Sequence, residues 1–333
     1  MTSTASGDSD ALSATAGRSI VLVAESDLNN PRLITARQAG GYGLDAQWND
    51  DFHHAVHALV TGERQGYYSD FGSLAGVAKT LTSAYFHDGT WSTFRGRTHG
   101  RPVDTRETPA YRFVVFDQDH DQVGNRAVGD RLPATLAGHP NRHGLLRIVS
   151  GLVLTAPCTP MLFMGEEWGA DTPWQFFTDH TDPGLAAAVT AGRRSEFAHH
   201  GWGQTDVPDP QDKETFLRSK LDWGQPSREP YRSLLGWYRA LLALRRSRPE
   251  LADPRFDRVH VDYDEDARWM VIRRGELRIA ANLGEAEAVL AIGEPAANPV
   301  ALLTSAAGIS IAPDAATMPP ATFAIIDLSP GPS

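Results

Sequence analysis

Two carboxylate side chains in this sequence stand where an enzyme could use them as a pair. Glu25 directly follows the aliphatic run 20–24, and Asp121 lies shortly after the apolar run 113–116, next to His120. Hydrolysis of a glycosidic bond needs two carboxyl groups, one to donate a proton and one to act as nucleophile or base. The residues therefore indicate sugar chemistry, with Glu25 as the proton donor. Asp121 and His120 suit a third role, in which they hold the ring hydroxyls of the sugar.

Strands and helices that alternate along the chain would position these residues. The predicted strands cover residues 20–24, 44–48, 112–116 and 161–164, and the predicted helices cover about 50–60, 73–85 and 141–155. We expect Asp50 and Asp51 to cap the first of these helices and Ser73 the second. Such alternation predicts a parallel sheet with catalytic side chains at its carboxyl edge. Because four strands are half of an eight-stranded barrel, the sequence predicts an α/β fold with a partial (β/α)8 TIM-type barrel.

The pattern changes after Pro249. Residues 170–230 predict long loops, and 231–246 predict an amphipathic helix. Beyond Pro249, short alternating runs predict strands, two of which flank Arg274-Gly275 as a hairpin. The predicted domains are a disordered leader at 1–17, a partial barrel at 18–249 and a small all-β sandwich at 250–333.

Composition excludes several classes of partner. The formal net charge is −10, which disfavours both nucleic acid and anionic membranes. No run is long and apolar enough to predict a membrane span. The lone cysteine, Cys158, cannot form an intrachain disulfide, so we expect a cytoplasmic protein with Cys158 in its core. The histidines and acids show no metal-binding spacing, and we expect neither a metal nor another cofactor.

Several longer segments resemble a known family. They are the runs 21–29, 41–48, 50–54, 115–126, 161–168, 176–180 and 219–223. In order and number they resemble the alpha-amylase superfamily of glycoside hydrolases and, more narrowly, the malto-oligosyltrehalose trehalohydrolases. The resemblance covers about residues 18–283. It implies hydrolysis of the α-1,4 bond next to a terminal trehalose unit of an α-glucan substrate, with release of trehalose.

The resemblance also implies roles for single residues. Glu25 would be the general acid/base and Asp121 the transition-state stabiliser. The implied substrate-binding residues are His120, Gln122, Asn125, Trp48, Asp50, Asp51, His53 and His54. In a retaining mechanism an aspartate nucleophile forms a glycosyl-enzyme, which water then hydrolyses.

This sequence departs from the family pattern at the nucleophile. The family carries it at the end of barrel strand four, in a Gly-Phe-Arg-Leu-Asp-like motif that precedes the acid, and no such motif precedes Glu25. Asp45 is an alternative, but it follows Glu25, and Gly43 stands where the motif has arginine, so we interpret Asp45 as part of the sixth strand. Asp119 stands where the family usually has asparagine, and an extra acid could raise the pKa of its neighbour.

Three hypotheses remain open at this point. The first is that the chain is the C-terminal part of a trehalohydrolase. The second is that it is a non-catalytic remnant or a half-enzyme that needs an N-terminal partner fragment. The third is that it belongs to a related branching or debranching enzyme. We expect the chain alone to be inactive, because the nucleophile is missing.

Overall fold

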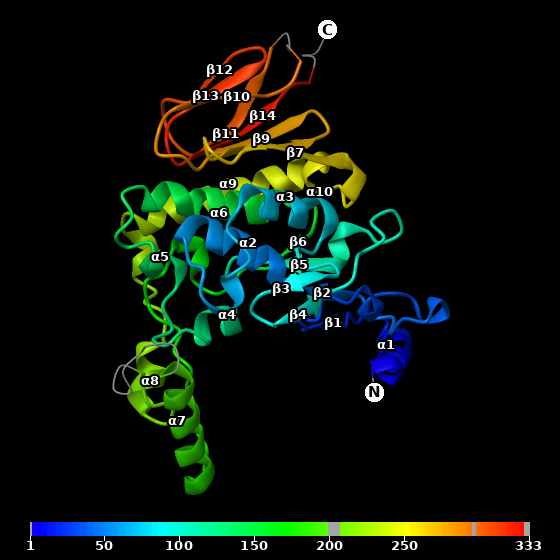
Figure 1. Ribbon diagram of the computed structural model, residues 1–333, viewed down its shortest axis with the longest axis vertical. Coiled ribbons are helices and arrows are strands. Elements are labelled where there is room, and N and C mark those ends of the chain that lie inside the picture. Colours follow the sequence, from blue (N-terminus) through cyan, green and yellow to red (C-terminus); the bar gives the residue numbers. More distant parts are fainter. Residues whose placement is uncertain (1, 199–206, 295–297, 330–333) are drawn as a thin grey trace. The chain divides into compact units, whose positions relative to one another are not determined.

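The computed structural model describes residues 2–198, 207–294 and 298–329 (Figure 1). The chain forms two compact units. The first comprises Met1–Asp117, His143–Met161 and Arg239–Ser333, and the second comprises Gln118–Arg142 and Leu162–Tyr238. The first unit thus holds both the predicted barrel strands and the C-terminal strands, and the predicted domain boundary near residue 250 stays a prediction.

A four-stranded parallel sheet lies in the first unit. Its order is β1 (Val23–Ala24), β2 (Ala46–Trp48), β5 (Phe113–Val115) and β6 (Thr159–Pro160). The four predicted strands are therefore present and parallel, but two of their predicted extents are wrong. The first strand is only two residues long, because it pairs on one side only. The last is centred before Met161, whose amide still donates to the carbonyl oxygen of Val115 at 2.9 Å.

The helices beside this sheet begin at recognisable caps. Ser73 caps α3 (Leu74–Ser83) by accepting from the amide of Gly76 at 3.0 Å, as predicted. The predicted capping of α2 (Asp50–Thr61) by its two aspartates is wrong, because Asn49 accepts from the amide of Phe52 at 3.4 Å. The helix predicted at 141–155 is confirmed as α6 (Arg142–Thr155).

The remaining elements outside the C-terminal strands include one correction. α1 (Thr2–Ala16) is helical where a disordered leader was expected. The others in the first unit are the hairpin β3 (Thr90–Ser92) and β4 (Arg97–His99), α10 (Pro249–Ala252), and short 3-10 helices at Pro31–Leu33, Arg37–Ala39, Gly66–Tyr68, Ala110–Arg112 and Phe256–Arg258.

The C-terminal strands form the predicted two-sheet sandwich (Figure 1). One sheet has the order β11 (Val300–Thr304), β14 (Thr322–Asp327), β9 (Leu277–Asn282), β8 (Trp269–Arg274), β7 (Val259–Asp264); the other is β10 (Ala288–Ala291), β13 (Ala315–Met318), β12 (Ser310–Ile311). Val271, Leu290 and Met318 are among the side chains that both sheets bury in a common core. The predicted hairpin is confirmed, since Arg274 pairs with Leu277 across a turn in which Gly275 has φ 57°.

The second unit is more helical than predicted. Its elements are α4 (His120–Gly124), α5 (Leu132–Thr135), α7 (Pro183–Ala198), α8 (Lys213–Arg218), the first part of α9 (Tyr231–Ser247), and 3-10 helices at Glu166–Trp168 and Gln225–Ser227. The helix predicted at 231–246 is confirmed. The prediction of loops throughout 170–230 is wrong at α7 and at α8. In α7 a run of alanines outweighs the flanking turn residues. Within the described ranges, no helix has the length and apolarity to cross a bilayer.

Candidate active site

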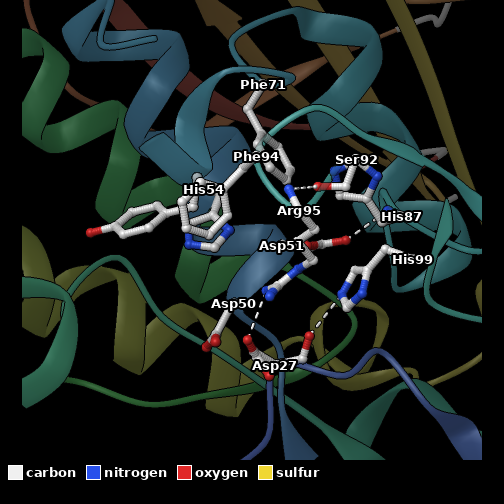
Figure 2. A pocket seen from close by; sticks show the side chains of 11 residues that line it. Asp27, Asp50, Asp51, His54, Phe71, His87, Ser92, Phe94, Arg95 and His99 are labelled. Carbon is white, nitrogen blue, oxygen red and sulfur yellow. Dashed lines mark hydrogen bonds and ion pairs between the residues drawn. The ribbon is translucent and has the colours of Figure 1, made fainter. Parts of the chain in front are cut away.

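A pocket in the first unit brings acids, histidines and aromatic rings together (Figure 2). It is lined by Asp27, Asp50, Asp51, His54, Tyr67, Phe71, His87, Ser92, Phe94, Arg95 and His99. Of the residues predicted to bind substrate, Asp50, Asp51 and His54 lie here, all at the start of α2. The other lining residues were not predicted. Asp27 belongs to the motif around Glu25, but Arg95 and His99 lie in a hairpin that carries no motif.

Asp51 is the structural anchor of this pocket. Its side chain is buried, and one carboxylate oxygen, Oδ2, accepts from the Asn29 side chain at 2.7 Å and from the amides of Phe86 at 2.9 Å and His87 at 2.7 Å. The carboxylate thereby joins three segments that are distant in the sequence. Burial raises the pKa of the Asp51 carboxyl to about 6, while these hydrogen bonds oppose the rise.

This pKa predicts how stability depends on pH. The folded protein holds the Asp51 proton up to about pH 6, whereas an unfolded aspartate loses it near the ordinary value of 3.8. The stabilising contribution of Asp51 to the folded state is therefore fully present below pH 3.8, and it is lost as the pH rises to about 6. At about 1.4 kcal/mol per pKa unit the loss is roughly 3 kcal/mol.

Urea unfolding from pH 4 to pH 7 should show this fall in the free energy of unfolding in the native chain and not in Asp51→Asn. The exposed-acid variant Asp266→Asn should keep it, and parallel curves for the native chain and Asp51→Asn would contradict the assignment.

The pocket histidines are neutral hydrogen-bonding groups. His54 stacks on Tyr67 with ring centroids 4.9 Å apart, and burial lowers its pKa to about 3. Burial also lowers the pKa of His87 and of His99. Nε2 of His99 donates to the carbonyl oxygen of Asp27 at 2.9 Å, and His87 lies 3.4 Å from the carboxylate of Asp70. Neutral imidazoles with defined N–H directions suit the recognition of sugar hydroxyls.

An ion pair ties the pocket to the segment that carries Glu25. Nη2 of Arg95 lies 2.7 Å from Oδ2 of Asp27, which is half exposed (Figure 2). Asp27 follows Glu25 by two positions, and Glu25 itself is exposed to solvent. Exposed ion pairs contribute little to stability, so we infer that the main effect of this pair is to position the segment around Asp27. The predicted proton donor therefore lies on a segment whose backbone and side chains are held by the pocket.

Other predicted site residues of the first unit lie outside the pocket lining. His53 is 2% exposed, and its Nε2 lies 2.9 Å from the Tyr68 hydroxyl. Nε2 of His57 lies 3.0 Å from Glu63. The side chains of His53, His57 and Asp117 could hold a metal ion, since their candidate ligand atoms lie within 4.8 Å of one another. The sequence spacing did not reveal this cluster.

Trp48 also packs internally. Its ring meets that of Phe116 edge to face, with centroids 5.7 Å apart, and the residue is half-buried. Such a contact is typical of core aromatic rings. Sugar contact by Trp48 and by His53 stays a prediction.

The remaining predicted residues lie around α4 in the second unit. Asp119 caps this helix by accepting from the amide of Gln122 at 2.6 Å, and burial raises the pKa of Asp119 to about 6. The sequence departure at Asp119 thus produces a helix cap. His120, Asp121 and Asn125 are exposed, and Nε2 of His120 lies 3.5 Å from the Asp121 carboxylate. Their roles toward a sugar stay predictions.

Comparisons with known proteins extend these observations. The chain is 55% identical over 273 residues to a malto-oligosyltrehalose trehalohydrolase from Mycobacterium tuberculosis, covering 82% of this chain and 46% of that protein. It is 53% identical over 276 residues to one from Rhizobium sp. (strain M-11), covering 83% of this chain and 46% of that protein. Residues 254–325 match a family model described as "Domain of unknown function (DUF3459)".

Solved structures agree. A candidate alpha-amylase from Salmonella typhimurium superposes with a TM-score of 0.76 at 35% identity, covering 93% of this chain and 51% of that chain. An alpha-amylase from H. orenii superposes with a TM-score of 0.58 at 17% identity, covering 97% of this chain and 56% of that chain, which shows a shared fold.

The fold and the paired-carboxylate motifs are those of the alpha-amylase superfamily of glycoside hydrolases. Sequence identity then narrows the assignment. The chain belongs to the malto-oligosyltrehalose trehalohydrolase family, and it spans 46% of the length of the two curated relatives described above. The resemblance seen in the motifs is confirmed.

Proposed function

We propose that this chain provides the general acid/base and the stabilising acid of a trehalohydrolase, which hydrolyses the α-1,4 bond next to a terminal trehalose unit and releases trehalose. The observation that carries the proposal is the identity of 55% over 82% of this chain to a relative of that name. The exposed Glu25, two positions before Asp27 of the acid- and histidine-lined pocket, supports it.

The chemistry assigns one step to each group. Glu25 protonates the leaving oxygen and later deprotonates the attacking water, while Asp121 and His120 hold ring hydroxyls as positive charge develops on the sugar. Asp45 is a poor nucleophile candidate, because its Oδ2 accepts from the amide of Leu22 at 2.8 Å and so braces β1 against β2. The nucleophile must come from residues other than these.

We further propose that β1, β2, β5 and β6 are strands five to eight of an eight-stranded barrel. Parallel strands are normally covered on both faces and closed or flanked at their edges. Here β1 ends the sheet, and Val21, Val23 and Leu28 around it are 59%, 44% and 52% exposed. The matched stretch is 46% of the trehalohydrolase from Mycobacterium tuberculosis, so more than half of that relative lies outside the match and is available to cover this edge. An N-terminal partner fragment is the occupant that this edge fits.

The open edge predicts self-association of the isolated chain. We expect micromolar samples to form oligomers in sedimentation velocity, because exposed apolar residues along an unpaired strand pair with other copies. Val23→Lys should reduce the association markedly, since a charge on an edge strand opposes pairing. The matched variant Val289→Lys, at a site 65% exposed in the C-terminal sandwich, should leave it unchanged. A single monomer species in the native chain, or equal effects of the two variants, would refute the open-edge interpretation.

A non-catalytic role is the competing proposal. It is favoured by the absence of a nucleophile motif from these residues. Adding the missing fragment distinguishes these two proposals. A half-enzyme regains turnover when a fragment that supplies the remaining strands is added, whereas a remnant binds sugar or fragment without turnover.

A further inference from the structure

One turn of the C-terminal sandwich contacts the ends of two helices that lie far from it in the sequence. Residues 265–268 connect β7 to β8. The Glu265 carboxylate accepts from the amides of Leu74 at 3.1 Å and Ala75 at 2.7 Å. Nη2 of Arg268 donates to the carbonyl oxygen of Leu59 at 3.0 Å. The same turn therefore reaches the start of α3 and the end of α2, and α3 packs beside β7 (Figure 1).

The charges of this turn match the helix ends that they meet. The first amides of a helix have no partner within the helix, and they carry partial positive charge, which a carboxylate satisfies. Ser73 accepts from Gly76, and Glu265 accepts from the two preceding amides, so α3 is capped jointly by a neighbour and by a distant residue. At the end of α2 the polarity is reversed, and there the turn supplies a guanidinium. Arg268 adopts φ 56°, an uncommon left-handed conformation for a residue other than glycine.

The start of α2 and the segment that follows α3 contribute residues to the pocket. α2 begins with Asp50, Asp51 and His54, which line it. α3 ends at Ser83 and leads to Phe86 and His87, whose amides donate to the Asp51 carboxylate. Figure 2 shows His87 beside Asp51. α2 and α3 also pack against each other. A displacement at the capped ends of two short, rigid helices is therefore carried to the hydrogen bonds at Asp51.

We propose that the turn 265–268 is a positioning element for the pocket: by capping α3 through Glu265 and α2 through Arg268, it aligns the two helices whose other ends meet at Asp51. The turn lies within residues 254–325, the stretch that matches a family model of unknown function. The proposal gives this part of the sandwich a role in shaping the pocket, whatever sugar the pocket binds.

The test compares local structure at both ends of α3 in the 333-residue chain. Hydrogen–deuterium exchange read by mass spectrometry should quicken in Glu265→Gln by about three- to tenfold, both in peptides covering 72–78 and in peptides covering 84–90. Glu265→Asp keeps the carboxylate and should restore most of the protection. The control Asp266→Asn removes the adjacent acid, which is also exposed, and should change neither region.

A second readout reports on the pocket alone. In protein labelled with ¹⁵N-phenylalanine, the Phe86 amide signal should move in Glu265→Gln, because the hydrogen bond from this amide to the Asp51 carboxylate is displaced, and it should keep its position in Asp266→Asn. Faster exchange confined to 72–78, with the Phe86 signal unchanged, would reduce Glu265 to a local cap and overturn the proposal. If Glu265→Gln does not fold, Arg268→Gln applies the same two readouts from the end of α2.

Discussion

The 333-residue chain, purified by itself, is expected to release no measurable trehalose from malto-oligosyltrehalose. A retaining glycosidase needs a nucleophile opposite its acid, and no Gly-Phe-Arg-x-Asp-like motif occurs in these residues. Removing one member of a catalytic set that acts as a unit costs many orders of magnitude in rate. Product should therefore stay at the level of a blank in a chromatographic assay sensitive to one turnover per enzyme per day.

Complementation gives the positive arm of this experiment. Co-expression with a fragment that covers the remainder of a full-length relative should yield a stable complex that releases trehalose. Turnover by the chain alone that disappears in Glu25→Gln would contradict the expectation and would point to a substitute nucleophile, with Asp45→Asn as the next variant to assay. A stable complex that never turns over would favour the non-catalytic remnant.

In the complemented enzyme, Glu25→Gln is expected to lower kcat by about a thousandfold or more. The amide has nearly the same shape as the acid but cannot give a proton to the leaving oxygen, and general acid catalysis contributes about 10²–10⁴ in rate. Steady-state kinetics on malto-oligosyltrehalose measure the loss. Asp266→Asn, an exposed acid in the β7–β8 turn, is the matched control and should retain full activity.

A substrate with an activated leaving group sharpens this test. An α-maltosyl fluoride needs little protonation at departure, so the first chemical step should be largely restored in Glu25→Gln, and a glycosyl-enzyme should accumulate because its hydrolysis lacks a base. If the fluoride is processed no better than malto-oligosyltrehalose, Glu25 is not the general acid. If Glu25→Gln retains kcat, the assignment of this carboxylate fails altogether.

The parts of the fold that local chemistry determines could be predicted from the sequence. Ser73 followed by apolar residues at helical spacing predicted α3 together with its cap, and Arg274-Gly275 between alternating runs predicted the β8–β9 hairpin. The prediction failed where local signals conflict. The alanine run of α7 lies among turn-forming residues, and the flanking composition was given too much weight.

The pocket was less predictable, because distant residues build it. The sequence motif identified Asp51 as a site residue, but it could not show that three donors from distant segments occupy one of its oxygens. Arg95 and His99 reach the pocket through the β3–β4 hairpin, and a hairpin side chain carries no motif of its own. Cross-chain contacts of this kind follow from packing, which one sequence without its fold does not disclose.

The burial of α2 has a consequence for how freely this protein can vary. All ten residues from Asp51 to Val60 are buried, so the helix has no water-facing side along this stretch. In a saturation mutagenesis library, α9 should show tolerated positions recurring every three to four residues, as for any helix with one face in water. Across Asp51–Val60 that rhythm should be missing, and nearly every position should reject polar or larger replacements. In laboratory evolution of this protein, accepted substitutions should therefore accumulate outside α2, because almost no substitution in this helix leaves folding unaffected.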